Sequence, residues 1–215
     1  MSRASTIDAY LFDLGNVVLR WRPEKLLRDI LGDAPSVKRF IEETALPELI
    51  LEQDRGLDAP GSEAWVAARA PHHLDSFRAY EARWVETLDG EIAETASLIR
   101  ALRAAGRPVF ALSNWASDHL ALAEPHFPIL RAFDDRVISA EHGLLKPDPA
   151  IYDLATARFG LEPARTLFID DRAENVETAA DLGFATHHFD PDAPQSLRAA
   201  LPESDARHFP TPSAG

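Results

Sequence analysis

The stretch AYLFDLGNV, residues 9–17, decides the fold of this chain. Its apolar half, Ala9–Phe12, predicts a buried strand, and the DLGN that follows predicts a loop. The same pattern returns in PVFALSN, residues 108–114, and in TLFIDD, residues 166–171. Each predicted strand therefore stops at a polar side chain that can take part in chemistry: Asp13, Ser113 or Asp170.

Helical segments separate these strands. Residues 92–102, 150–159 and 175–182 carry apolar side chains at helical spacing, and a glycine follows each segment. Weaker strand patterns lie at 137–138 and 185–188. Strands that alternate with helices of this length predict parallel βαβ units, so we expect an α/β protein with a Rossmann-like, three-layer core. Ligands of such open sheets bind at the carboxyl ends of the strands, where the polar residues would converge.

Residues 21–89 do not follow this alternation. They show no strand pattern but four helical ones, at 26–31, 37–51, 63–70 and 76–88. We therefore expect a helical cap at 21–89 inserted into a core made of residues 1–20 and 90–200. The alternative is a surface helical subdomain with no role at the site. The segment 201–215 contains three prolines and is expected to be a poorly ordered tail.

Composition limits the function. The formal net charge of -13, without any Lys/Arg run, argues against a nucleic-acid partner. The absence of cysteine excludes disulfides, thiolate catalysis and cysteine metal sites. No apolar segment approaches membrane-spanning length, and the N-terminus lacks a signal-peptide pattern, so we expect a cytoplasmic protein without a membrane partner. A small anionic substrate stays compatible with this charge, because a site can be locally positive.

The strand-end residues together provide the groups that phosphoryl transfer needs. Asp13 alone is more typical of a turn or helix cap, but Ser113 adds a hydroxyl and Lys146 adds a compact positive charge. Lys146 is one of only three lysines among 22 basic residues. The adjacent carboxylates Asp170 and Asp171 would repel each other unless a cation such as Mg²⁺ neutralised them. The alternative is that one of this pair caps the next helix and the other points to water.

Four motifs, in this order and spacing, resemble those of the haloacid dehalogenase superfamily. Residues 12–17 (FDLGNV) resemble the first motif, residues 112–114 (LSN) the second, residues 143–149 (GLLKPDP) the third and residues 168–171 (FIDD), with Asn175 one turn on, the fourth. A helical insertion directly after the first motif is the cap position of one large subgroup. The resemblance spans most of the chain.

The resemblance implies specific roles for these residues. Asp13 would be the nucleophile, with Ser113 and Lys146 as its catalytic partners. The phosphate group would be bound by Asn16, Ser113, Asn114, Lys146 and, from a cap loop facing the substrate, Arg55. Mg²⁺ would be held by Asp13, the Gly15 carbonyl, Asp170 and Asp171. Apart from the resemblance, Trp115 directly follows Asn114 in the sequence, and we therefore expect it to line the substrate pocket.

Gly15 departs from the family pattern. Most phosphatases of the family carry there a second Asp, which protonates the leaving group, and loss of a general acid typically slows a reaction by ~10²- to 10⁴-fold. Family members similar to this chain share the Asp-Leu-Gly-Asn-Val motif, and sugar-1-phosphatase activity occurs among them. The resemblance thus implies a Mg²⁺-dependent phosphatase of a small phosphorylated metabolite, such as a sugar phosphate with a good leaving group.

Two other functions stay open at this point. A 2-haloacid dehalogenase releases halide, which needs no proton, so Gly15 would be harmless; such enzymes need no metal, however, and Asp170-Asp171 count against this function. A degenerate family member could instead serve as a binding or regulatory module. The retention of all the charged motif residues counts against that.

Overall fold

The computed structural model describes residues 7–207 and contains a five-stranded sheet at its centre. The strands are β1 (Ala9–Phe12), β4 (Val109–Ser113), β5 (Asp135–Ile138), β6 (Thr166–Asp170) and β7 (Ala185–His188), in the order β5-β4-β1-β6-β7. All neighbouring strands pair in parallel. The predicted α/β fold is therefore confirmed, with the strand that leads to Asp13 between those that lead to Ser113 and Asp170.

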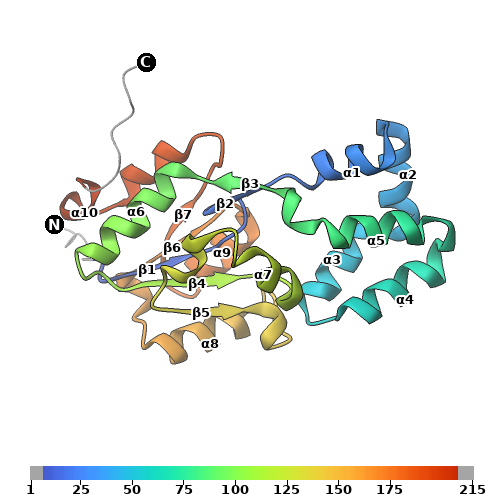
Figure 1. Cartoon of the computed structure of the whole chain (residues 1–215). Coiled ribbons are helices and arrows are strands. Elements are labelled where there is room, and N and C mark those ends of the chain that lie inside the picture. The colour runs from blue at the N-terminus through green and yellow to red at the C-terminus, as the bar shows by residue number, and fades with distance from the viewer. Residues whose placement is uncertain (1–6, 208–215) are drawn as a thin grey trace, which may run out of the picture.

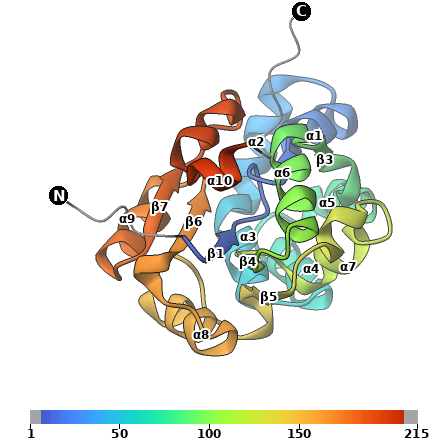
Figure 2. The same ribbon diagram turned by 90° about the vertical axis from the view of Figure 1, so that its left-hand side faces the viewer.

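Helices cover both faces of the sheet, which gives three layers (Figure 2). The pleat of β1 sends Tyr10 and Phe12 to one face and Ala9 and Leu11 to the other, because successive side chains of a strand alternate. The first face packs against α6 (Ala93–Ala104), and the second against α8 (Pro149–Phe159) and α9 (Ala173–Asp181). All four β1 side chains are buried, so this strand anchors both halves of the core.

Shorter helices complete the core. They are α7 (Ser117–Ala123) and the 3-10 helices Pro128–Arg131, Ser139–Glu141, Pro163–Arg165 and Pro194–Ala200. None of the helices in residues 7–207 is both long enough and apolar enough to cross a membrane.

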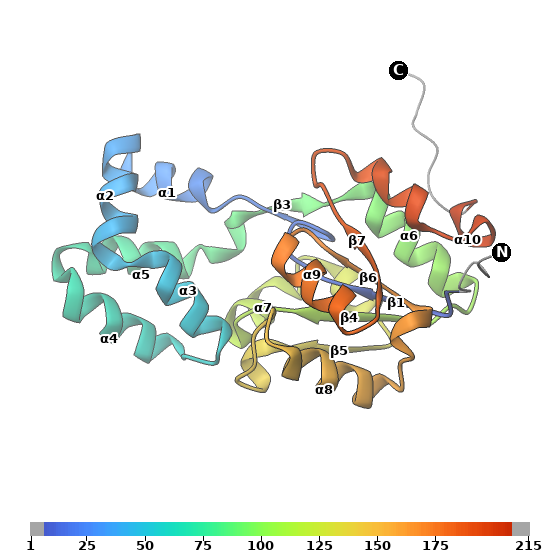
Figure 3. The same cartoon turned by 180° about the vertical axis from the view of Figure 1, so that it is seen from behind.

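The cap consists of five helices that lie beyond the carboxyl ends of the strands (Figures 1 and 3). They are α1 (Pro23–Leu31), α2 (Ala34–Thr44), α3 (Leu46–Asp54), α4 (Ala59–Arg69) and α5 (Leu74–Ala82), with 3-10 turns at Pro71–His73 and Trp84–Thr87. The single helix predicted over 37–51 is wrong. Ala45 adopts a left-handed conformation with φ 51°, and a new helix begins at Leu46. Pro47 lies in the first turn of this helix, where proline is tolerated because its missing N–H has no helical partner.

Two short strands connect the cap to the core, which corrects the expectation that residues 21–89 contain no strand. β2 (Leu19–Trp21) and β3 (Leu88–Glu91) pair antiparallel, so the chain enters and leaves the cap side by side. Neither strand is long enough to show a clear alternation in the sequence. The pair fixes where the cap is attached, next to the loop that follows Asp13.

The C-terminal segment is ordered further than expected. Residues Glu203–Ala206 form the short helix α10, and Leu201 and Asp205 are buried. Asp205 accepts a hydrogen bond from the Tyr10 hydroxyl and pairs with Arg107 at 2.9 Å, which holds this segment against the core. Residues 201–207 therefore pack on the core, although the sequence predicts a poorly ordered tail there, and residues 208–215 lie outside the described part.

Candidate active site

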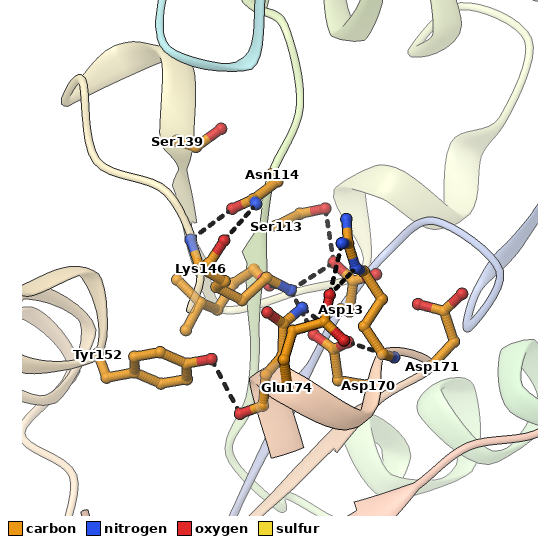
Figure 4. A network of polar contacts seen from close by, with 12 residues as sticks. Asp13, Ser113, Asn114, Ser139, Lys146, Tyr152, Asp170, Asp171 and Glu174 are labelled. Carbon is orange, nitrogen blue, oxygen red and sulfur yellow. Dashed lines mark hydrogen bonds and ion pairs between the residues drawn. The ribbon is translucent and has the colours of Figure 1, made fainter. Parts of the chain in front are cut away.

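Asp13 stands directly after β1, and its backbone N–H donates to the carbonyl of Ile169 at 2.9 Å. Its carboxylate oxygen Oδ1 accepts hydrogen bonds from the Ser113 hydroxyl and the Lys146 ammonium, each at 2.8 Å (Figure 4). Within residues 7–207, the other oxygen, Oδ2, accepts no side-chain hydrogen bond. One oxygen of Asp13 is therefore fixed, and the second is open to a ligand.

Hydrogen bonds fix both the side-chain ammonium and the backbone of Lys146. Its ammonium also donates to Asp170 Oδ2 at 2.5 Å and to the Leu112 carbonyl at 2.8 Å, so all three of its N–H groups have partners. The amide of Asn114 forms two bonds with the Lys146 backbone, at 2.8 and 2.9 Å. Burial alone would lower the pKa of Lys146, but Asp13 and Asp170 raise it above its ordinary value. Lys146 is thus a fixed positive charge.

Asp170 and Asp171 have different environments although they are adjacent. Asp170 is fully buried, and besides Lys146 it accepts bonds from the Arg172 N–H and the Asn175 amide, both at 2.9 Å. Asp171 is half-buried and lines the cavity described below. Asp170 is therefore a positioning residue for Lys146, whereas Asp171 faces the space in front of Asp13.

The site carries excess negative charge. Carboxylate oxygens of Asp13, Asp170 and Asp171 all lie within 4.8 Å of one another, and Lys146 is the cation in contact with them. Burial raises the pKa of Asp13; Lys146 opposes this effect, and Asp170 and Asp171 add to it. Burial and Asp170 likewise raise the pKa of Asp171. A cluster of hard oxygen donors with surplus negative charge fits a divalent cation such as Mg²⁺.

Of the remaining residues predicted to bind phosphate, two line the cavity and one does not. Asn16 lines the cavity, and its side-chain oxygen accepts a hydrogen bond from the Trp21 N–H at 3.1 Å. Asn114 also lines the cavity, although its amide is engaged with Lys146. Arg55 does not line it: this side chain is about half exposed and pairs with Glu52 at 2.5 Å. The structure therefore places the predicted substrate-binding arginine on the surface.

Asp54, next to Arg55, is the site residue that sequence reasoning missed. It ends α3, and its side chain lines the cavity together with Asp13. Its carbonyl accepts a bond from the Ser139 hydroxyl at 2.6 Å. Desolvation, followed by the charge of Asp13, raises the pKa of Asp54 to about 7. A carboxyl group with such a pKa can both donate and accept a proton near neutrality.

A cavity of about 470 Å³ lies between the cap and the carboxyl ends of the strands. Asp13, Gly15, Lys146 and Asp171 line its core side, and helices α1, α2 and α3 line its cap side. Trp115 lines it too, as the sequence predicted. The cavity is large enough for a small-molecule substrate whose reactive group meets Asp13.

Comparisons with known proteins agree with this geometry. A family model described as haloacid dehalogenase-like hydrolase matches residues 7–183. The sesquiterpene phosphatase astK of Aspergillus oryzae is 28% identical over 192 residues, which are 86% of this chain and 90% of astK. A HAD family enzyme of Bacteroides thetaiotaomicron, solved with magnesium and inorganic phosphate, has a TM-score of 0.70 at 25% identity, covering 86% of this chain and 95% of that one.

Other relatives match over shorter stretches. An (S)-2-haloacid dehalogenase of Pseudomonas fluorescens is 32% identical over 92 residues, or 43% of this chain and 40% of that protein. The match to mouse acyl-CoA dehydrogenase family member 10, 38% identical over 89 residues, spans 8% of that protein. Phosphatase and dehalogenase names thus both occur among proteins similar to this chain.

Proposed function

Since this chain belongs to the haloacid dehalogenase-like hydrolase family, we propose that it is a Mg²⁺-dependent phosphatase that hydrolyses a small phosphorylated metabolite through Asp13. The observation that carries this proposal is the surplus of buried carboxylates around Lys146. Without a metal ion, the negative charge of the half-buried Asp171 in front of Asp13 would weaken the binding of an anionic substrate, because like charges repel. The similar enzyme solved with magnesium and inorganic phosphate supports the same function.

Each of these side chains has a separate role in the reaction. In the first step, Asp13 attacks the phosphorus, an Asp13–phosphorus bond forms and the bond to the leaving alcohol breaks. Ser113 and Lys146 hold the nucleophile and offset the charge of the phosphoryl oxygens. Asp13, Asp171 and the Gly15 carbonyl would hold Mg²⁺, which supplies further charge neutralisation when it is bound.

We assign the proton transfers to Asp54, because Gly15 offers no proton. Protonated Asp54 gives its proton to the leaving alcohol oxygen as that bond breaks. In the second step, the Asp54 carboxylate takes a proton from a water molecule that attacks the phosphorus. The Asp13–phosphorus bond then breaks, inorganic phosphate leaves, and Asp13 and Asp54 return to their starting states. A cap residue would thus replace the acid that the first motif lacks.

Phosphate release from para-nitrophenyl phosphate, measured with Mg²⁺ and with a chelator, tests the function. We expect turnover only with Mg²⁺ and none with Asp13→Asn, a nearly isosteric change. Chloride release from 2-chloropropionate in the presence of the chelator serves as the opposing assay. Metal-independent chloride release without phosphatase activity would replace this proposal with the dehalogenase function, and inactivity in both assays would favour a binding module.

A further inference from the structure

The cap side of the cavity is almost entirely apolar. Of the cap residues that line it, only Glu24, Gln53 and Asp54 are polar or charged. Helices α1, α2 and α3 contribute aliphatic side chains, among them Leu27, Ile41, Leu46 and Ile50. The aliphatic part of this wall stabilises a hydrocarbon by removing it from water and offers no hydrogen-bond partner to a polar ligand.

Aromatic side chains extend this surface toward Asp13. Trp21, Trp84 and Trp115 all line the cavity, and the ring centroids of Trp84 and Trp115 are 5.9 Å apart. His119 stacks on Trp84 with centroids 4.2 Å apart and planes 8° apart. The apolar surface is therefore continuous from the cap helices to the neighbourhood of the reacting groups.

Among the polar side chains of this wall, Gln53 is already engaged with neighbouring cap residues. The Gln53 amide nitrogen donates to Ser62 at 3.1 Å and to Glu81 at 3.2 Å. The other oxygen of Glu81 lies 2.8 Å from His119 Nε2. Recognition of sugar hydroxyls requires a free donor or acceptor for each hydroxyl, because a buried hydroxyl without a partner is destabilised. The indole N–H groups of Trp21 and Trp115 are two such donors, and the aliphatic side chains of the cap wall supply none. Within the described residues, the exposed Glu24 is the one charged cap side chain besides Asp54 that lines the cavity.

From this distribution we infer that the substrate is the phosphate monoester of an apolar alcohol, a hydrocarbon chain or ring system, and not a sugar phosphate. This inference rests on the proposed phosphatase activity. The phosphoryl group meets Asp13 and Lys146, and the hydrocarbon occupies the cap side of the cavity. Asp54, to which we assign the proton transfers, lines the same cavity.

The cavity wall predicts a quantitative dependence on chain length. Burial of one methylene group contributes about 0.8 kcal/mol, which corresponds to about fourfold in kcat/KM. In a series of n-alkyl phosphates from ethyl to decyl, kcat/KM should rise by about this factor for each added methylene until the cavity is filled. Glucose 1-phosphate and glucose 6-phosphate should both be poorer substrates than hexyl phosphate.

A matched pair of variants tests whether the wall produces this dependence. Ile50 lines the cavity, whereas Ile30 is a similarly half-buried cap isoleucine that does not. Ile50→Thr should lower kcat/KM for decyl phosphate by about tenfold and leave ethyl phosphate nearly unchanged. Ile30→Thr should change neither. Binding of 1-decanol, followed by tryptophan fluorescence, should weaken in Ile50→Thr alone and gives a readout independent of catalysis.

The possible outcomes distinguish failure of the apolar substrate class from failure of the phosphatase function. A flat chain-length profile, or glucose phosphates that outperform hexyl phosphate, would overturn the apolar substrate class while the phosphatase function stands. Equal effects of Ile50→Thr and Ile30→Thr on decyl phosphate would also overturn it. If no phosphate ester is hydrolysed with Mg²⁺, the proposed function fails and this inference fails with it.

Discussion

Replacement of Asp54 by asparagine should reduce activity and increase stability at the same time. The substitution keeps the shape of the side chain but removes the titratable proton. In the folded protein the pKa of Asp54 is about 7, raised from 3.8 mainly by desolvation. Between these values the unfolded chain releases its proton while the folded chain retains it. Wild-type stability therefore falls as pH rises from about 4 to about 7, and the Asp54→Asn variant would escape this loss.

The size of the effect follows from the shift. Each pKa unit corresponds to about 1.4 kcal/mol, so about three units give at most about 4 kcal/mol. Because the Asp54 side chain is partly open to the cavity, we expect about half of this value, or ~2 kcal/mol at a pH of about 8. For activity, loss of a general acid-base predicts a decrease of ~10²- to 10⁴-fold with alkyl phosphates. An aryl phosphate, whose leaving group needs no proton, should be affected much less.

The assay combines urea unfolding of both proteins at pH 5 and pH 8, without Mg²⁺, with turnover of hexyl and para-nitrophenyl phosphate. The stability advantage of Asp54→Asn over wild type should be larger at pH 8 than at pH 5. The rate loss should be confined largely to the alkyl ester. If the variant loses stability equally at both pH values, or loses both activities by one factor, Asp54 is a structural residue and the proton donor lies elsewhere.

Further predictions concern the metal and the charged network. Asp171→Asn should weaken Mg²⁺ binding in calorimetry by at least about tenfold, and an unchanged affinity would remove Asp171 from the ligand set. Lys146→Met should lower kcat for para-nitrophenyl phosphate by ~10²-fold or more, because three buried bonds to the ammonium are lost; near-normal kcat would contradict its role. Gly15→Asp should be tolerated, since a Cβ there would meet only Asp13 Oδ2 at 3.9 Å. It should also restore alkyl phosphatase activity to Asp54→Asn, and failure to do so in a folded protein would argue against a missing acid.

The positions of the reactive residues could be predicted from the sequence where they directly follow a buried strand. Asp13, Ser113 and Asp170 each follow a buried apolar run, and parallel pairing requires such strand ends to meet at one edge of the sheet. Because helices cover both faces of the sheet, each of these strands is a continuous apolar run, and such runs are easy to locate in the sequence. The break in the cap near Ala45 is also signalled in the sequence, by Pro47.

The parts that the sequence did not reveal depend on three-dimensional context. Arg55 and Asp54 are adjacent in the sequence, and only the docking of α3 against the 3-10 helix Ser139–Glu141 determines that Asp54 lines the cavity. The α10 segment is ordered by Asp205, whose partners Tyr10 and Arg107 are far away in the sequence. The apolar character of the cavity arises from separate helices, and no single stretch of sequence displays it.

Covalent catalysis by Asp13 is tested by peptide mapping with mass spectrometry, on enzyme quenched in acid during turnover of para-nitrophenyl phosphate. We expect one phosphoryl group on the peptide that contains Asp13 when Mg²⁺ is present. No phosphoryl group is expected with chelator or in Asp13→Asn. Phosphate release that continues without any modification of Asp13, or in the Asp13→Asn variant, would show that Asp13 is not the nucleophile.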